Sequence, residues 1–171
     1  MRTRIRAAGR SSSGDGIVLF RAIGRRDPAT PLGETVRRRL REESIIWLTT
    51  VSGTGTPQPN PVWFLWQEDA DSEWGDGSFL IFNSNTSARL STFTERPRVA
   101  LHFNSINGGG ITVFTGDVEV LEGHPGAHEV PAYVAKYGPR LEAMGVGKGL
   151  DEFMEKYSVV TRIRPVKVRG F

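Results

Sequence analysis

Two alternating segments, Arg98-Val-Ala-Leu-His-Phe-Asn104 and Ile111-Thr-Val-Phe-Thr-Gly-Asp-Val-Glu-Val-Leu121, flank the turn-forming tetrapeptide Asn107-Gly-Gly-Gly110. Asn-Gly and Gly-Gly tolerate the positive φ angles of tight hairpin turns, and alternation of apolar with polar residues is typical of half-buried strands. This stretch therefore predicts a long antiparallel hairpin. Because both strands are long and alternate strongly, we expect them to form the wall of a β-barrel.

Hairpins and short helices are predicted on both sides of this wall. The β-branched and aromatic run 44–51 leads through Ser-Gly-Thr-Gly-Thr into a returning strand at 57–67, which indicates a second hairpin. Strands joined mostly by hairpins, with helices inserted rather than alternating, favour a mainly β fold over a doubly wound sheet. We therefore predict an antiparallel β-barrel with peripheral helices. The other strands are expected at 78–83 and at 158–169, the latter interrupted by Pro165. Helices are expected at 31–43, at about 127–137 and at about 151–156. A further short helix, which Asn85 or Thr86 can cap, is expected to end before Pro97.

The basic charge of the chain belongs to its first residues. The formal net charge is +3 over 171 residues, but residues 1–27 carry a net charge of +5, so the remainder carries −2. A folded part with this charge has no overall attraction for a polyanion. We therefore expect no nucleic-acid partner, and a nucleic-acid-binding function would depend on the basic tail alone.

Residues 1–30 combine Arg, Ser and Gly with only one short apolar patch, which predicts a disordered or loosely attached extension. Residues 31–171 are then predicted to form one domain, which is long enough for a sizeable core. An Arg-rich, acid-poor N-terminus is also typical of organelle transit peptides, although this one lacks a convincing amphipathic pattern. A start codon assigned too far upstream explains it equally well.

Composition excludes several kinds of chemistry. The chain has no cysteine, so thiol nucleophiles, disulfides, iron–sulfur clusters and cysteine-ligated zinc are excluded. No apolar run approaches the roughly 20 residues that span a bilayer, so we expect a cytoplasmic protein with no membrane partner. His124 and His128 are separated by Pro-Gly and have no third ligand nearby, so no metal site is predicted. No Gly-x-Ser-x-Gly motif supports a hydrolase triad.

The segment Asn83-Ser-Asn-Thr-Ser-Ala-Arg-Leu90 has the composition of a phosphate-binding turn. Hydroxyl groups, amides and a helix N-terminus attract an anion, and a guanidinium can grip two of its oxygens at once. A capped surface helix with an ordinary arginine explains the same residues. The candidate phosphate-binding residues are Ser84, Asn85, Thr86, Ser87, Ala88 and Arg89.

The returning strand contains three prolines between positions 57 and 61, which have no N–H to donate to a sheet. Its first half must therefore be an edge, a bulge or a segment that faces a ligand, and its free backbone groups and aromatic residues suit a planar molecule. Alternation would place Trp63 and Leu65 on one face and Phe64 and Trp66 on the other. At least one of these pairs is therefore expected in the barrel core or in a dimer interface.

Six segments occur together in an order and spacing that are typical of one protein family. They are Ile46-Trp-Leu-Thr-Thr-Val51, Gly55-Thr-Pro-Gln-Pro-Asn-Pro-Val-Trp-Phe64, Ala88-Arg-Leu90, Arg96-Pro-Arg-Val-Ala-Leu-His102, Gly116-Asp-Val-Glu-Val120 and Arg162-Ile-Arg-Pro-Val-Lys-Val-Arg-Gly-Phe171. With these motifs the chain, from about residue 34 to its end, resembles the mycobacterial and actinobacterial flavin and deazaflavin oxidoreductases of the pyridoxamine 5'-phosphate-oxidase-like class.

The resemblance implies a split β-barrel, of the FMN-binding kind, that forms a homodimer with two cofactor sites at the subunit interface. It also implies that the turn and helix from Ser84 to Arg89 hold the phosphate of the cofactor. The residues that it places along the flavin or deazaflavin ring are Pro59, Asn60, Pro61, Val62 and Trp63.

The chain departs from the family pattern at three positions near the expected phosphate. Arg89 stands where relatives often have lysine, which keeps the positive charge and adds bidentate geometry. Ser87 and Ser91 stand where relatives are often basic. The anion is therefore expected to be held more weakly, or with the help of an arginine from the partner subunit.

The function implied by the resemblance is hydride transfer between coenzyme F420 and an organic acceptor, with FMN as the alternative cofactor. The ring carries the redox chemistry, while the protein supplies orientation and a pocket poor in water. No catalytic acid or base can be nominated, and Lys136 is expected to face solvent. A non-catalytic protein that sequesters a flavin, a deazaflavin or haem is a different class of function that fits the sequence, although no convincing histidine ligand for haem is present.

Overall fold

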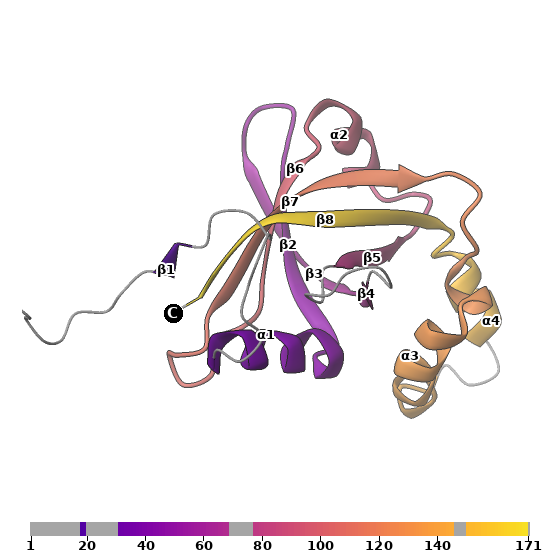
Figure 1. Ribbon diagram of the computed structural model, residues 1–171. Helices are drawn as coiled ribbons and strands as arrows, with labels where there is room; N and C mark the ends of the chain where they lie inside the picture. The colour runs from indigo at the N-terminus through magenta and orange to yellow at the C-terminus, as the bar shows by residue number, and fades with distance from the viewer. Residues whose placement is uncertain (1–17, 20–30, 69–76, 146–149, 171) are drawn as a thin grey trace, which may run out of the picture.

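The computed structural model describes residues 18–19, 31–68, 77–145 and 150–170. Within them, every named strand belongs to one antiparallel sheet (Figure 1). The strands are β1 (Val18–Leu19), β2 (Ile45–Val51), β3 (Pro57–Trp63), β4 (Leu65–Glu68), β5 (Gly77–Asn83), β6 (Arg98–His102), β7 (Thr112–Leu121) and β8 (Val159–Gly170). The helices are α1 (Pro31–Glu42), α2 (Arg89–Glu95), the 3-10 helix η1 (Ala127–Glu129), α3 (Pro131–Ala143) and α4 (Leu150–Glu155).

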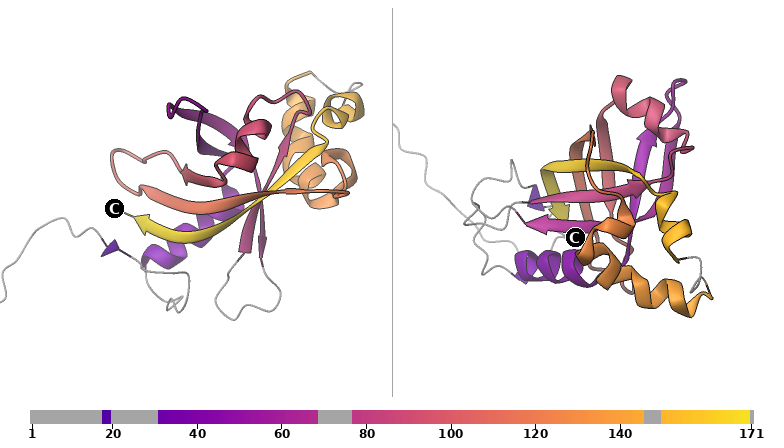
Figure 2. Two further views of the ribbon diagram at one scale, coloured as in Figure 1. Left: turned by 90° about the horizontal axis from the view of Figure 1, so that it is seen from above. Right: turned by 90° about the vertical axis from the view of Figure 1, so that its right-hand side faces the viewer.

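The sheet is curled into an open barrel. The strand order is β3-β2-β6-β7-β8-β5-β4, with the short β1 added beside β8. β3 and β4 occupy the two ends of this order, yet they are neighbours in the chain, so the sheet bends until its ends adjoin at Phe64 (Figure 2). The predicted mainly β fold, an antiparallel barrel with peripheral helices, is confirmed.

One face of the curled sheet forms the core of the barrel. In β2, the buried Ile46 and Leu48 alternate with half-buried residues, as the two-residue period of a strand requires. Helix α1 adds Val36 and Leu40, which its amphipathic spacing predicts. The barrel core consists of Val36, Leu40, Ile46, Leu48, Val62, Phe64, Phe79, Ile81, Phe93, Val99, Leu101, Phe103, Phe114, Val118, Ile163 and Val168.

A second cluster covers the other face of β5. Phe79 and Ile81 belong to the barrel core, whereas Leu80 and Phe82 pack with residues of α3 and α4, which lie beyond the ends of β7 and β8 (Figure 1). Because both of its faces are buried, β5 is continuously apolar from Phe79 to Phe82 rather than alternating. The helical cluster consists of Leu80, Phe82, Ala127, Tyr133, Tyr137, Leu141, Met154 and Val160.

The returning strand predicted at 57–67 is divided at Phe64. β3 pairs with β2, whereas β4 leaves it and pairs with β5. Trp63 and Leu65 pack against the helical cluster, while Phe64 and Trp66 lie in or against the barrel core, so the predicted alternation of faces is confirmed. Alternation alone does not reveal the division, because one long strand and two short ones have the same pattern.

Two further predictions differ from the structure in detail. The helix predicted at 127–137 consists of η1 and α3, because Pro131 starts a new helix, where its missing N–H costs nothing. The interruption predicted at Pro165 is a β-bulge rather than a break. At that point the register of β8 against β7 shifts between Thr115 and Gly116, and the strand continues.

The glycine-rich hairpin forms as predicted. Asn107 and Gly108 have positive φ angles of 50° and 82° in the turn between β6 and β7, as this turn chemistry requires. The register of the hairpin includes Leu101 opposite Phe114, both in the barrel core. Of the extension predicted at 1–30, only β1 lies within the described residues, and the prediction of disorder falls on residues outside them.

Candidate functional site

A cavity lies where the end of β3, the start of α2 and the helices α3 and α4 come together. Its volume is about 260 Å³. Arg89 is the one charged residue that lines it within the described part of the chain. An apolar cavity with one cation suits a largely aromatic ligand that carries a negative group. The lining residues are Pro61, Val62, Trp63, Phe82, Arg89, Ala127, Tyr133, Leu141, Phe153, Met154 and Tyr157.

Contacts between aromatic rings fix the walls of this cavity. Trp63 stacks on Tyr137 with the ring centroids 4.5 Å apart and an interplanar angle of 3°. Tyr133 lies 4.6 Å from Tyr137 and 4.4 Å from Phe82, measured between centroids. Burial raises the pKa of both tyrosines, so they stay neutral at physiological pH. The walls are therefore uncharged and held by their neighbours.

Arg89 brings its guanidinium to the cavity from the first residue of α2. Its Nε donates a hydrogen bond of 2.8 Å to Oδ1 of Asn83. Within the described residues, its two terminal nitrogens have no hydrogen-bond or ion-pair partner. Burial lowers the pKa of Arg89 and the nearby Tyr157 opposes this, but arginine stays protonated in proteins. A charged guanidinium with free donors can bind a phosphate or a carboxylate.

Two side chains of α3 hold the break between β3 and β4. The hydroxyl of Tyr137 accepts a hydrogen bond of 2.9 Å from the N–H of Phe64, and it lies 2.7 Å from the Phe64 carbonyl and 2.9 Å from the Ser44 carbonyl, to which it can donate. Nζ of Lys136 donates to the Phe64 carbonyl at 3.1 Å. The backbone groups that the break removes from the sheet are thereby satisfied.

The prediction that Lys136 faces solvent is wrong. The side chain is half-buried because it supplies a donor to the Phe64 carbonyl, and its ammonium group lies 4.1 Å from the centre of the Phe64 ring. Burial lowers the pKa of Lys136 to about 8, and Glu43 acts in the opposite direction. Lys136 does not line the cavity, so its contacts assign it to the fold rather than to the site.

The candidate phosphate-binding turn is shaped by its own hydroxyl groups. Oγ of Ser84 lies 2.9 Å from Oγ1 of Thr86 and accepts a hydrogen bond of 3.3 Å from the Thr86 N–H. Helix α2 begins only at Arg89, with Ala88 as its N-cap and no capping side chain. The prediction that Asn85 or Thr86 caps this helix is therefore wrong, because the polar residues form a turn before it.

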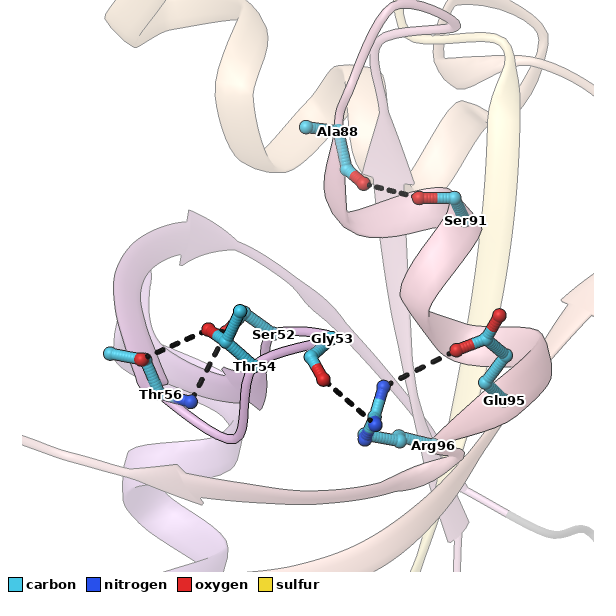
Figure 3. A network of polar contacts seen from close by, with 8 residues as sticks. All are labelled: Ser52, Gly53, Thr54, Thr56, Ala88, Ser91, Glu95 and Arg96. Carbon is cyan, nitrogen blue, oxygen red and sulfur yellow. Dashed lines mark hydrogen bonds and ion pairs between the residues drawn. The ribbon is translucent and has the colours of Figure 1, made fainter.

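The turn between β2 and β3 is tied to α2. Nη2 of Arg96, which directly follows α2, donates to the Gly53 carbonyl at 3.1 Å, and Nη1 pairs with Glu95 at 3.3 Å (Figure 3). This contact fixes the start of β3 relative to the helix that carries Arg89. The turn itself is shaped by hydrogen bonds among Ser52, Thr54 and Thr56.

The free edge of β3 presents carbonyl groups. The Ser52 N–H donates to the Thr56 carbonyl at 2.9 Å, and bonded pairs alternate with non-bonded pairs along an antiparallel ladder. Thr56 is therefore at a bonded position, and every second residue after it is bonded as well. The three prolines, at positions 57, 59 and 61, fall between these positions, so their backbone nitrogens and carbonyls point away from β2. Of the three alternatives predicted for the first half of this strand, an edge, a bulge or a ligand-facing segment, the structure shows an edge. The prolines leave hydrogen-bond acceptors without donors along 57–61.

The cavity brings together residues from both predicted segments. Pro61, Val62 and Trp63 line it from β3, and Arg89 lines it from α2. The cofactor-binding roles predicted for all the candidates stay predictions, and the other candidates lie outside the lining. They are Pro59, Asn60, Ser84, Asn85, Thr86, Ser87 and Ala88.

The sequence patterns did not predict the residues that α3 and α4 contribute to the cavity. Tyr133 precedes Tyr137 by four residues within α3, which is the spacing of one face of a helix. This pair could have identified the face of α3 that covers the site, whereas Phe153 lies in α4 and its ring partner Tyr157 follows that helix. Their position over β3 could not be predicted from spacing alone.

Neither a metal cluster nor a membrane-spanning helix occurs among the described residues. No group of three or more histidine, aspartate or glutamate side chains in this part of the chain could hold a metal ion. Nδ1 of His124 lies 2.8 Å from the carbonyl of Pro125. No described helix is long and apolar enough to cross a bilayer.

Comparisons with known proteins agree with this fold. The sequence pattern of the pyridoxamine 5'-phosphate oxidase family matches residues 32–171. A solved F420 reductase has a TM-score of 0.53 at 20% identity, covering 77% of this chain and 94% of its own. A conserved hypothetical protein from Mycobacterium tuberculosis has a TM-score of 0.55 at 17% identity, covering 80% and 82%.

A third solved structure is a protein from Listeria innocua that is provisionally assigned as a pyridoxamine 5'-phosphate oxidase. It has a TM-score of 0.53 at 15% identity and covers 81% of this chain and 96% of its own. Similarities at this level of identity concern the fold, and with the family match they establish the split β-barrel. A search of curated proteins found no match.

Proposed function

The chain belongs to the pyridoxamine 5'-phosphate oxidase family, and we propose that it is an oxidoreductase that transfers a hydride between the deazaflavin coenzyme F420 and an organic acceptor. The observation that carries this proposal is the cavity in which the end of β3 and Arg89 meet. The cavity offers apolar and aromatic surface for a ring and one cation for a phosphate. This pairing is what a phosphorylated redox cofactor needs.

The residues present fit such a cofactor in three respects. Trp63, stacked on Tyr137, gives a broad apolar wall of the kind on which rings pack. Arg89 has donors left for an anion. The carbonyl edge of β3 offers acceptors to the ring N–H that flavins and deazaflavins share. These features support F420 and FMN equally.

The size of the cavity supports a site that two subunits complete. Ligand pockets usually have volumes of roughly 300 to 1,000 Å³, and this cavity, at about 260 Å³, would hold only part of a cofactor. We therefore propose a homodimer with cofactor sites at the subunit interface. Light scattering should give about twice the chain mass of 18.9 kDa. A monomeric mass at micromolar concentration would contradict the dimer.

In the proposed reaction, the chain binds and orients the reactants. The bound deazaflavin ring supplies the hydride chemistry. Arg89 would hold the phosphate, Trp63 would offer an apolar wall to the ring, and the walls formed by Tyr133 and Phe153 would exclude water from the reacting atoms. The acceptor takes up a proton as well as the hydride, the reduced deazaflavin loses both on oxidation, and we assign no side chain to the transfer of the proton.

The choice of F420 over FMN is supported by the sequence resemblance and by the F420 reductase among the structural neighbours. FMN is the alternative cofactor within the same fold. A non-catalytic protein that sequesters one of these cofactors is the alternative function, since the cavity would serve it equally well.

Titration of the purified protein with F420 and with FMN, followed by fluorescence, tests the cofactor. We expect a dissociation constant in the micromolar range or below for F420 and a weaker one for FMN. A lack of affinity for both would overturn the proposal. Protein that binds reduced F420 but oxidises it with none of a broad panel of acceptors would indicate the non-catalytic alternative.

A further inference from the structure

Asn83, the last residue of β5, is completely buried and uses both ends of its side-chain amide. Nδ2 donates to the carbonyls of Ile81 and Val159 at 3.0 and 3.1 Å and lies 3.1 Å from Oγ1 of Thr161. Oδ1 accepts the hydrogen bond of 2.8 Å from Nε of Arg89. The residue therefore joins β5, β8 and the start of α2 in one polar network inside an otherwise apolar wall.

The surroundings of this amide fix its orientation. A flipped amide would place Oδ1 against the carbonyl oxygens of Ile81 and Val159 and would turn Nδ2 toward a guanidinium N–H, which cannot accept a hydrogen bond. Because acceptors surround Nδ2, Oδ1 can only face Arg89. Asn83 thus presents a fixed acceptor to the guanidinium.

This acceptor contacts Arg89 at one position only. A guanidinium has five N–H groups, and Nε contributes one of them. The four N–H groups of the terminal nitrogens have no partner within the described residues, and Arg89 lines the cavity. A guanidinium held at Nε is restrained in direction while its terminal nitrogens stay available for bidentate contact with two oxygens of an anion.

We propose that Asn83 is a positioning residue, which orients Arg89 so that its terminal nitrogens bind the phosphate of the cofactor. This inference rests on the proposed function. The affinity for the phosphate then depends on Asn83, although this residue does not line the cavity and acts only through Arg89.

The inference can be separated from a purely structural role of Asn83. A structural residue, when removed, would weaken the binding of the ring and of the phosphate alike, because the whole cavity would loosen. A positioning residue would weaken the phosphate contact selectively. The ratio of the affinities for a phosphorylated ligand and its phosphate-free counterpart reports that contact alone.

The experiment measures the affinities of the full-length protein for FMN and riboflavin, and for F420 and its phosphate-free deazaflavin chromophore. The variants are Asn83→Ala, Arg89→Ala and the double variant, with Ser78→Ala as a control. Ser78 is also a buried polar residue of β5, but at the other end of the strand. If Asn83→Ala fails to fold, Asn83→Ser replaces it, because its hydroxyl is too short to reach Arg89.

The wild-type protein should prefer the phosphorylated ligand by roughly tenfold or more, and Arg89→Ala should remove most of that preference. Asn83→Ala should lower it by at least about threefold. In the double variant, the preference should equal that of Arg89→Ala alone, because a residue that acts through Arg89 has no effect once Arg89 is gone. Ser78→Ala should keep the wild-type preference.

Three outcomes would overturn the inference. The wild-type protein could bind each pair of ligands equally, the Asn83 variants could keep the wild-type preference, or Asn83→Ala could lower it further in the Arg89→Ala background. Failure of the proposed function has a different signature, in which the wild-type protein binds no member of either pair.

Discussion

Arg39 is buried and Arg89 is partly buried, and the surroundings of these two arginines differ in kind. Arg39, in α1, is 3% exposed, and each of its nitrogens has a partner. Nε and Nη2 contact Glu43 at 2.8 and 2.7 Å, Nη2 donates to the Asn104 carbonyl at 2.6 Å, and Nη1 donates to the Gly110 carbonyl. Arg89 has one partner within the described residues, Asn83.

Arg39 stabilises the fold, whereas Arg89 can bind a ligand. Arg39 joins α1 to the two ends of the hairpin turn between β6 and β7, and its guanidinium lies 4.7 Å from the centre of the Phe103 ring. With every nitrogen engaged, it has little left for a ligand. Arg89 faces a cavity and has free donors. Replacing Arg39 should therefore lower the stability of the fold, whereas replacing Arg89 should lower the affinity for a ligand.

The largest effect is expected for the stability of the Arg39 region. Arg39→Ala removes the partner of Glu43 and leaves the carbonyls of Asn104 and Gly110 without their donor. We expect a loss of about 3 to 5 kcal/mol in the free energy of unfolding, measured with urea. Arg41→Ala, an exposed neighbour on α1, should change it by less than about 0.5 kcal/mol. Similar losses of stability in Arg39→Ala and Arg41→Ala would contradict the structural role of Arg39.

For the Arg89 region, the expected effect falls on affinity. Arg89→Ala should weaken F420 binding by about 1.5 to 3 kcal/mol, because a charge-assisted contact with the phosphate is lost, and should change unfolding by less than about 1 kcal/mol. Fluorescence titration and urea denaturation measure the two quantities. Arg98→Ala is the control, since Arg98 is exposed and paired with Asp117. An unchanged affinity in Arg89→Ala would mean that the phosphate binds at another site.

Local patterns predict much of this fold and less of its site. The hairpin of β6 and β7, helix α1 and the faces of Trp63 and Phe64 follow from periodicity and turn chemistry, which involve neighbouring residues only. The cavity joins positions 61–63, residue 89 and helices beyond residue 130. Contacts across such separations leave no local pattern, so the sequence indicated two parts of the site and missed the helices that cover it.

The break at Phe64 and the burial of Lys136 have the same origin. The N–H and carbonyl of Phe64 leave the sheet and need partners, which Tyr137 and Lys136 supply from 73 and 72 residues away. A lysine on a helix is usually exposed, and the hydrogen bond to this carbonyl, which has left the sheet, explains why Lys136 is half-buried. Buried polar groups generally find partners. Arg39 finds them within the protein, whereas the terminal nitrogens of Arg89 have none among the described residues.

A pair of buried threonines tests this rule for hydroxyl groups. Oγ1 of Thr112 in β7 is buried without a partner in the described residues, whereas Oγ1 of Thr161 in β8 contacts Asn83 and the Ile81 carbonyl. Thr112→Val should raise the free energy of unfolding by roughly 1 kcal/mol, and Thr161→Val should lower it by about as much. Urea denaturation measures both changes. Destabilisation by Thr112→Val would mean that its hydroxyl has a partner.

Lys136 is another partly buried cation, with one hydrogen bond and a pKa that burial lowers to about 8, and the effect of replacing it should be the smallest. Between pH 8 and 10 the unfolded lysine is protonated more fully than the folded one, so the free energy of unfolding should rise with pH. Above pH 10 the raised pKa values of Tyr133 and Tyr137 reverse the trend, because the unfolded tyrosines ionise first.

Lys136→Met should abolish the rise between pH 8 and 10, which solvent screening keeps below about 1 kcal/mol per pH unit. Urea denaturation at pH 7.5, 8.5 and 9.5 measures the slope. The exposed Lys156, replaced by methionine, provides the control and should leave the slope unchanged. If Lys136→Met kept the wild-type slope, the lysine would titrate as in water, and its contact with the Phe64 carbonyl would not withdraw it from solvent.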